Sequence, residues 1–579
     1  MSESTHKVKS ISWNGQMKIL RLHHKKTPLY VPRSACVSKG DEISVSSERC
    51  SVICNNGFAD ILPTYIGYEN LQVGQLKLQF VIKEITEEDE QIGYGRLQQL
   101  HYRSEALFGR TARLVMLCFH PLYPRVVGYI ELASPFFMSK PRSRLFDSPF
   151  TCGNISWKTW DKSSLQKNIH VVIRIARCVI SPEFRGLSLG TNLLNHAFSF
   201  ARSRWQVAGL KPLFVEMSAD MLKYVPFASN AGMHYIGETE GNVARVADDL
   251  HYLLKNIKRV QNGEIVKKES CGIVDKQISR MNKAVSLMNN MGWDINMLID
   301  KLHRFSHSPT LKDYNILHQL LSLPKPTYMA GLVPEATRFL STRLEELNLC
   351  QPKKLAPKDC EPINKMIKVN SIALSFSSNV RRSNATTAVQ KAFGISPTHF
   401  SHEIISELSF DMEPGDIVLI TGSSGSGKTS LLKALNTELS VSTGTIKYPQ
   451  NFKSSVFKEI RSQKPLIEVL SNGDVTRALQ LLGTVGLSDA FVYFKRFSEL
   501  SNGQQYRAML ASMLMTGANV WFIDEFCANL DHLTAVVVAN RLQRVARDVG
   551  AILIAASSQP ESFVSALKPS KVIRLHAGV

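Results

Sequence analysis

The octapeptide GSSGSGKT at residues 422–429 constrains the fold of this 579-residue chain more than any other feature. It follows an apolar run at 417–420 and precedes Leu431, Leu432 and Leu435, so it predicts a glycine-rich turn between a buried strand and a helix. Glycines let the backbone curl until successive N–H groups and the helix N-terminus point at one anion. The pattern therefore predicts an α/β domain that binds the phosphates of a nucleotide. The candidate binding residues of this loop are Gly422, Ser423, Ser424, Gly425, Ser426, Gly427, Lys428, Thr429 and Ser430.

A second apolar run, at 520–523, ends in the two carboxylates Asp524 and Glu525. A buried strand with this ending delivers both side chains to one edge of a sheet. We expect Asp524 and Thr429 to hold a Mg²⁺ ion while Lys428 neutralises the β- and γ-phosphate oxygens. Glu525 is expected to polarise the attacking water as a general base.

Between these elements lies the sequence LSNGQQ at 500–505, which resembles the LSGGQ signature of ABC ATPases, with Asn502 in place of the first glycine. Gln463 resembles the Q-loop glutamine that senses the γ-phosphate, and residues 529–531 resemble the D-loop. The resemblance extends over about residues 361–579 and implies ATP and Mg²⁺ as cofactors, with Thr429, Gln463 and Asp524 around the metal. The further ATP-binding residues that it implies are Gln463, Ser501, Gly503, Gln504 and Asp531.

In this family the signature serine of one subunit caps the γ-phosphate held by the other, so the resemblance implies a homodimer through the ATPase domains. The chain departs from most transporter ATPases because the short span from Lys428 to Ser501 leaves room for only a small helical subdomain. By register, Ser558 occupies the position where the family usually has a histidine. A serine hydroxyl donates a hydrogen bond with a shorter reach. We therefore take Glu525 and Ser558 as the catalytic residues and expect slow or switch-like hydrolysis.

A second motif, RGLSLG at 185–190, follows a strand-like run at 171–180 and opens a helical pattern at 191–201. It resembles the acyl-coenzyme A loop of GNAT acetyltransferases, which aims backbone N–H groups at the cofactor's pyrophosphate. Ser188 stands where that family prefers glycine or alanine. The resemblance implies acetyl-CoA or another acyl-CoA as a cofactor. Its expected binding residues are Val179, Ile180, Arg185, Gly186, Leu187, Ser188, Leu189 and Gly190.

The surrounding segments extend the GNAT resemblance. Runs at 113–119 and 126–132 resemble its central hairpin, and 213–217 with 227–233 resemble its next strand and closing segment. Transfer needs a base for the acceptor nitrogen and an acid for the leaving thiolate. The candidates by position are Glu216, Ser218 and Tyr224.

Together the two halves resemble a family of ABC-type ATPases fused to a predicted acetyltransferase domain. The acyltransferase-like half is also similar to Mom-type enzymes that modify adenine in phage DNA, in 174–190 and 225–232. The net charge of +20 independently favours a polyanionic partner, so we expect nucleic acid, with DNA favoured. Three functions stay open: an ATP-driven enzyme that modifies nucleic acid or an attached protein, a nucleotide-switched binding protein whose GNAT-like part has lost its chemistry, and a transporter ATPase.

Apolar spacing and turn signals divide the α/β chain into four expected parts. These are a β-rich module at 1–90, the GNAT-like domain at 91–240, a helical connector and linker at 241–360, and the ABC-type ATPase domain at 361–579. Ten scattered cysteines, of which only Cys50 and Cys54 are close together, indicate neither a disulfide framework nor a zinc site. The N-terminal residues lack an apolar core, and no apolar run reaches membrane-spanning length. We expect a soluble, cytoplasmic protein without membrane contact.

Overall fold

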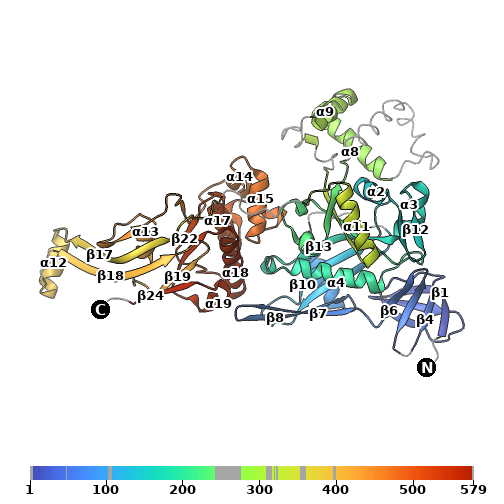
Figure 1. Ribbon diagram of the computed structural model, residues 1–579, viewed down its shortest axis with the longest axis horizontal. Helices are drawn as coiled ribbons and strands as arrows, with labels where there is room; N and C mark the ends of the chain where they lie inside the picture. Colours follow the sequence, from blue (N-terminus) through green and yellow to red (C-terminus); the bar gives the residue numbers. More distant parts are fainter. Residues whose placement is uncertain are drawn as a thin grey trace.

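The computed structural model describes residues 4–46, 48–101, 109–241, 275–307, 324–351, 360–395 and 399–576, with the isolated positions 107, 316, 317 and 320. Figure 1 shows an elongated molecule in which the segment after residue 360 lies at one end and the two N-terminal sheets lie at the other. Among these residues no helix combines the length and the apolar character needed to cross a membrane.

The first sheet contains six antiparallel strands in the order β3-β2-β1-β4-β5-β6. Alternating side chains along these strands, such as Leu20 and Leu22 on β2, are buried in one small apolar cluster. On the opposite face Arg21 of β2 is exposed, whereas Ser44 of β4 and Ser51 of β5 are buried. The strands are β1 (Ser4–Asn14), β2 (Met17–Leu22), β3 (Leu29–Pro32), β4 (Glu42–Val45), β5 (Cys50–Cys54) and β6 (Gly57–Leu62).

The second sheet contains eight strands in the order β15-β16-β14-β13-β10-β9-β8-β7. All neighbours are antiparallel except β13 and β14, which run parallel. Because a parallel pair needs a crossover, the chain passes through the helix α4 between these two strands. The strands are β7 (Ile66–Val73), β8 (Leu76–Glu84), β9 (Thr111–Cys118), β10 (Val126–Ala133), β13 (Val172–Ile180), β14 (Phe214–Ser218), β15 (His234–Glu238) and β16 (Pro326–Gly331).

The eight-stranded sheet includes strands from both sides of the boundaries expected at residues 90 and 240. The hairpin β7–β8 precedes residue 90 yet pairs with β9, and β16 lies between β14 and β15 although it follows residue 240. Periodicity within a strand does not reveal which neighbour will satisfy its backbone hydrogen bonds, so the sequence pattern did not indicate this pairing across residues 90 and 240. The strand β16 lies in a stretch where a helical pattern was expected.

Helices cover both faces of the eight-stranded sheet. Ile173 and Ile175 of β13 pack with α4, whereas Val172, on the opposite side of the pleat, packs in the cluster that includes α11. The helices of this part are α1 (Glu88–Gln98), α2 (Lys140–Phe146), α3 (Lys162–Asn168), α4 (Leu189–Arg204), α5 (Phe227–Asn230) and α11 (Pro334–Glu346); a small hairpin joins β11 (Phe150–Cys152) and β12 (Ile155–Trp157).

The expected helical connector is only partly described. Helices α8 (Asp275–Met291) and α9 (Ile295–His307) pack together through a separate apolar cluster that includes Leu287, Leu298 and Leu302. The helical pattern expected at 242–274 and most of the expected linker, 352–359, lie outside the described residues.

The last part combines a parallel sheet with an antiparallel one. The parallel sheet has the order β21-β22-β23-β19-β24, and the antiparallel sheet has the order β18-β17-β20. The parallel strands are β19 (Ile417–Gly422), β21 (Ser454–Val456), β22 (Val520–Ile523), β23 (Ile552–Ser557) and β24 (Lys571–Leu575), and the antiparallel ones are β17 (Ile367–Asn379), β18 (His399–Met412) and β20 (Thr443–Lys447). The helices are α12 (Asn384–Phe393), α13 (Lys428–Leu435), α14 (Leu466–Ser471), α15 (Val475–Thr484), α16 (Ala490–Tyr493), α17 (Asn502–Met515), α18 (His532–Val549) and α19 (Val564–Leu567).

Candidate functional site

The glycine-rich loop joins β19 to α13, and its shape depends on glycine at both ends. A Cβ atom at Gly422 would lie 2.3 Å from the main-chain oxygen of Leu575, and one at Gly427 would lie 2.1 Å from Cγ2 of Ile404. Lys428 begins α13, and its Nζ donates hydrogen bonds to the main-chain oxygens of Gly422 at 2.9 Å and Ser423 at 2.7 Å. The loop therefore closes around one ammonium group at a helix N-terminus, a site suited to phosphate.

Thr429 and Asp524 meet although 95 positions separate them. Thr429 Oγ1 donates a hydrogen bond to Asp524 Oδ2 at 2.7 Å. The reason is the strand order, since β22 and β19 flank β23 in a parallel sheet and their carboxyl ends share one edge. Glu525 follows on a turn with φ of 48° and is exposed, as is Ser558 just beyond β23.

A hydroxyl and a carboxylate oxygen at this separation fit the coordination of Mg²⁺, which prefers oxygen ligands and binds beside phosphates. The glycine cradle and Lys428 fit the phosphates themselves. Gln463 is exposed in the connection between β21 and α14. The chain's own residues therefore fit both cofactors.

The signature motif begins the helix α17. Ser501 and Gln504 form a capping box, in which Ser501 N donates to Gln504 Oε1 at 3.1 Å. Gly503 lies against α18, because a Cβ atom there would be 3.3 Å from Thr534 Cγ2. Asp531 in turn caps α18 by accepting a hydrogen bond from Thr534 N at 2.9 Å. Signature and D-loop residues therefore lie side by side, with Ser501 and Asp531 exposed.

The expected acyl-CoA loop lies beyond the end of β13. Gly186 has φ of 101° and Ser188 has φ of 63°, and α4 begins at Leu189. A left-handed serine costs roughly 1 kcal/mol, which explains a preference for glycine at this position. Ser188 is exposed, whereas Leu187 and Leu189 are buried in the core. Val179 and Ile180, the remaining expected binding residues, end β13.

The strand β14 ends before β13 does. The two pair from Val172 with Phe214 to Ile175 with Met217, and β14 ends at Ser218 while β13 continues to Ile180. The carboxyl end of a parallel strand next to a helix N-terminus is a typical place for ligand binding.

The three acyl-transfer candidates have different surroundings. Glu216 is buried, and its Oε1 accepts a hydrogen bond from Arg142 Nη1 at 2.8 Å. Ser218 lies on the same face of β14, and its Oγ lies 2.9 Å from Thr327 Oγ1. Burial raises the pKa of Tyr224, so its phenol stays protonated at neutral pH. The sequence analysis did not find Arg142, because nothing local marks a residue 74 positions before its partner.

Arg185 and Pro182, beside this loop, contact the ATPase helices directly. Arg185 Nη1 donates to the main-chain oxygen of Ser488 at 3.3 Å and lies 3.4 Å from Asp489 Oδ2. From the other side, Arg507 Nη1 on α17 donates to the main-chain oxygen of Pro182 at 3.3 Å. One continuous apolar core contains residues of both halves. The segment expected to bind acyl-CoA therefore lies at the interface between the two halves.

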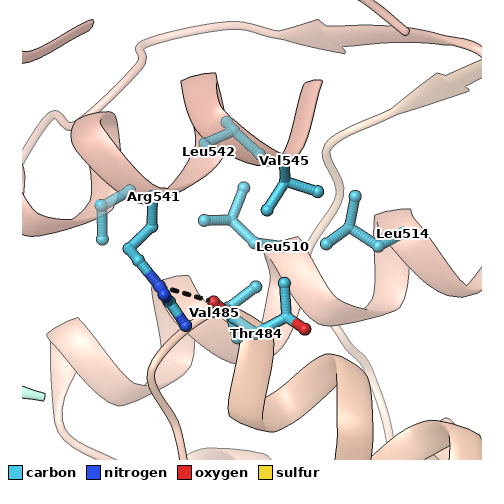
Figure 2. Close-up of a pocket in the computed structure, with 8 residues that line it drawn as sticks. Thr484, Val485, Leu510, Leu514, Arg541, Leu542 and Val545 are labelled. Atoms are coloured by element: carbon cyan, nitrogen blue, oxygen red, sulfur yellow. Dashed lines mark hydrogen bonds between the residues drawn. The ribbon is translucent and has the colours of Figure 1, made fainter. Parts of the chain in front are cut away.

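Gly186 faces α18 at the same interface. A Cβ atom there would lie 3.2 Å from Val537 Cγ1 and 3.3 Å from Arg541 Cγ. Figure 2 shows Arg541 reaching from α18 to the end of α15, where its Nε donates to the main-chain oxygen of Thr484 at 2.9 Å. The hollow beside it measures about 10 Å³, no larger than one water molecule. Its lining is Thr484, Val485, Leu510, Leu514, Val538, Arg541, Leu542 and Val545.

Comparisons with known proteins agree with this geometry for the C-terminal part. A family model described as "ABC transporter" matches residues 405–528. The cytochrome c biogenesis ATP-binding export protein CcmA of Wolbachia pipientis wMel is 31% identical over 185 residues, which cover 29% of this chain and 89% of that protein. The aliphatic sulfonates import ATP-binding protein SsuB of Delftia acidovorans is 33% identical over 201 residues, covering 32% and 81%. A solved dimeric bacterial ABC transporter cassette matches with a TM-score of 0.30 at 16% identity, covering 37% of this chain and 95% of that one.

A phosphate loop between strand and helix, with a carboxylate from a neighbouring parallel strand against its threonine, defines a P-loop ATPase. Through this domain the chain belongs to the family of ABC ATPases, and it binds and hydrolyses ATP.

Proposed function

We propose that the ATPase works as a head-to-tail homodimer in which Ser501 of one copy completes the ATP site of the other. The chain carries one glycine-rich loop and one signature motif. The supporting observation is that Ser501 and the loop residues Ser423 to Gly425 are all exposed, so each element has a surface to offer to a second copy. Ser501 caps the start of α17, where Gly503 and Gln504 form the first turn, and Asp531 caps the start of the neighbouring helix α18.

In this dimer each residue has a distinct role. Lys428 neutralises the β- and γ-phosphate oxygens, while Thr429 and Asp524 hold the metal together with Gln463. Mg²⁺, when bound, withdraws charge from the transferring phosphoryl group. Glu525 accepts a proton from the attacking water. Ser558, at the end of the strand between β19 and β22, donates a hydrogen bond toward the γ-phosphate.

The dimer is tested with Glu525→Gln, which removes the base and should retain ATP between two copies. Size-exclusion chromatography with light scattering should show a dimer with ATP and a monomer without it. The double variant Glu525→Gln with Ser501→Arg should stay monomeric, because the arginine side chain is much larger than that of serine and obstructs the shared site. A monomer for Glu525→Gln at saturating ATP contradicts the head-to-tail arrangement.

We also propose that the eight-stranded sheet and its helices form a GNAT-like domain that binds an acyl-CoA. The start of α4 beside the end of β14 carries it, because the first N–H groups of a helix, here those of Leu189 and Gly190, precede the first bonds back to the main-chain oxygen of Ser188, which Thr191 N and Asn192 N make at 3.0 Å and 3.3 Å. These two donors suit a pyrophosphate.

Transfer in this domain requires two proton movements. An acyl-CoA bound here would supply the thioester, and the acceptor nitrogen would be acylated with loss of the coenzyme A thiolate. Glu216, whose Oε2 has no hydrogen-bond partner within the described residues, would accept the proton from the acceptor nitrogen. Tyr224, kept protonated by burial, which raises its pKa, would give a proton to the leaving thiolate. Ser218 orients the acceptor from the same face of β14.

Coupling between the two activities follows from where the acyl-CoA loop sits. Arg185 binds the turn between α15 and α16, Gly186 packs on α18, and Arg507 of the signature helix binds Pro182. A shift of α17 against α18 when ATP joins the two copies therefore moves groups that contact the loop. We assign nucleic acid, or a protein attached to it, as the acceptor because of the net charge of +20.

The alternative is a nucleotide-switched nucleic-acid-binding protein whose GNAT-like part recognises without transferring. Calorimetry with acetyl-CoA separates the two, and the structure selects Gly190 for the test. A Cβ atom at Gly190 would meet only Phe227, at 3.7 Å, which is ordinary contact. Gly190→Asp adds a negative charge at the helix start and should abolish binding, while Gly190→Ala should retain most of it. Absence of acetyl-CoA binding by the unmodified protein rejects the transferase.

A further inference from the structure

A strongly basic hollow lies on the N-terminal six-stranded sheet, far from the ATP site in Figure 1. It measures about 440 Å³ and is open to solvent. Five of its six lining residues carry or can carry positive charge, and none is acidic. The lining is Lys9, Leu22, His23, His24, Lys25 and Lys26.

Two backbone irregularities bring these side chains together. Lys9 is the extra residue of a bulge in β1, because the pairing with β2 shifts between Val8 and Ser10. His24 follows β2 with φ of 62°, a left-handed conformation that costs a histidine roughly 1 kcal/mol. Bulges commonly re-aim a side chain, and strained residues gather at functional sites. The bulge and the turn both direct cations to the same hollow.

An exposed ring lies on the same hairpin as the hollow. Trp13, near the end of β1, is 57% exposed, and the cationic group of Arg33, which is itself exposed, lies 5.3 Å from its ring centre. An exposed ring beside a cation is a common feature of surfaces that bind a nucleic acid strand, since bases stack on rings while cations bind phosphates.

The six-stranded sheet is held firmly to the eight-stranded one. Asn56 makes two hydrogen bonds to the main chain of Lys211, with distances of 3.0 Å and 2.8 Å. Gln206 Nε2 donates to the main-chain oxygen of Cys36 at 2.7 Å and to Asp41 Oδ2 at 2.8 Å. A polyanion bound in the hollow would therefore have a fixed position relative to β14, which begins three residues after Lys211.

We propose that this hollow binds the phosphodiester backbone of a nucleic acid and holds it for the GNAT-like domain. The inference rests on the proposed function, in which nucleic acid is the partner, and it assigns that partner to a particular surface. The hollow holds the backbone through Lys9, Lys25 and Lys26, with the two histidines at its rim.

The test compares two triple variants with the same change of charge. Lys9→Glu, Lys25→Glu and Lys26→Glu together alter the hollow, and Lys158→Glu, Lys162→Glu and Lys167→Glu alter exposed lysines on and before α3. Binding of labelled single- and double-stranded DNA and RNA is measured by fluorescence anisotropy at several salt concentrations, after circular dichroism has shown that both variants are folded.

The hollow variant should bind at least tenfold more weakly, and its plot of log affinity against log salt should be shallower by about two units, since each lost phosphate contact removes about 0.7 to 0.9. The α3 variant should stay within roughly twofold of the unmodified protein. Equal weakening in both variants overturns the site but leaves a nucleic acid partner in place. The site is also overturned if inorganic phosphate, at matched ionic strength, competes as effectively as an unlabelled oligonucleotide does. Failure of the unmodified protein to bind any of the nucleic acids rejects both the site and the nucleic acid partner.

Discussion

Arg507 of the signature helix donates a hydrogen bond from Nη1 to the main-chain oxygen of Pro182, 325 positions earlier in the chain. The same nitrogen donates to the main-chain oxygen of Gly486 at 3.1 Å. Arg507 is only 4% exposed, and burial lowers its pKa to about 10. A buried guanidinium is destabilising unless its hydrogen bonds offset the desolvation. This one joins the ATPase helices to the segment that leads into residues 185–190, the proposed acyl-CoA loop.

Replacing Arg507 with methionine should uncouple the two halves. The change removes both hydrogen bonds and leaves two main-chain oxygens without this donor, at a cost of about 1–3 kcal/mol. We expect acetyl-CoA to change the rate of ATP hydrolysis in the unmodified protein and to have little effect in Arg507→Met. Arg544→Met, an exposed arginine on α18, is the matched control and should behave as the unmodified protein. An acetyl-CoA response preserved in Arg507→Met contradicts a role for this contact.

Thr429→Ala should impair the use of Mg²⁺. It removes the hydroxyl that lies 2.7 Å from Asp524 Oδ2, so the metal loses one oxygen ligand and the carboxylate loses its orientation. The Mg²⁺ concentration for half-maximal ATP hydrolysis should rise about 10- to 100-fold. Thr429→Ser retains the hydroxyl and should remain near the original value. An unchanged Mg²⁺ requirement in Thr429→Ala would place the metal on other residues.

The ATP site could be predicted from the sequence because its chemistry is carried by short continuous motifs. The sequence of residues 422–429 is enough to indicate a strand-to-helix turn. In a parallel sheet the carboxyl end of a neighbouring strand lies at the same edge as this turn, so Asp524 is expected beside it. The interface between the halves could not be predicted in this way. Arg185 and Asp489 are ordinary charged residues in their local sequence. They meet because the two halves pack together, with η2 (Pro182–Phe184) on α18 and Arg185 on the residues before α16.

Sheet membership could not be predicted in this way either. Turn signals and apolar alternation indicated a strand at 76–82, within β8, but the run of β7 was not singled out and β16 lies in a stretch where a helical pattern was expected. The choice of sheet depends on contacts between distant segments. The pair Arg142 and Glu216 was missed for this reason, although Glu216 itself was a candidate from its position within the strand-like run at 213–217.

Ser558→His should increase ATP turnover. Ser558 is exposed at the carboxyl end of β23, which lies between the strand of the phosphate loop and the strand of Asp524. An imidazole there reaches further than a hydroxyl and can donate to the γ-phosphate. We expect the turnover number at saturating ATP to rise several-fold, while Ser558→Ala should lower it. Steady-state release of phosphate measures both, and a decrease in Ser558→His would show that the serine is adapted to this site.

Lys18 should give the N-terminal sheet an unusual alkaline stability. Burial lowers the pKa of Lys18 to about 8, against about 10.4 for an unfolded chain. Between these values the unfolded state binds more protons than the folded state, so the free energy of unfolding should rise with pH from about 8 to 10.4. The gain should be about 1–3 kcal/mol, because a difference of one in pKa between the two states corresponds to about 1.4 kcal/mol and Lys18 is 9% exposed. Below pH 8 the charged ammonium bears its full desolvation cost, which its hydrogen bond to the main-chain oxygen of Ala35 only partly offsets.

Lys18→Met isolates this contribution from the cysteines and tyrosines that also titrate in alkaline solution. The midpoint of thermal unfolding, followed between pH 7 and 10 through the fluorescence of the exposed Trp13, should rise in the unmodified protein relative to Lys18→Met as the pH increases. Parallel curves for the two proteins would mean that Lys18 stays charged in the folded protein and that its hydrogen bond offsets the cost of desolvation. If the Lys18 ammonium is desolvated, Lys18→Met should be the more stable protein at pH 7. The two curves should then converge at high pH, where Lys18 loses its charge.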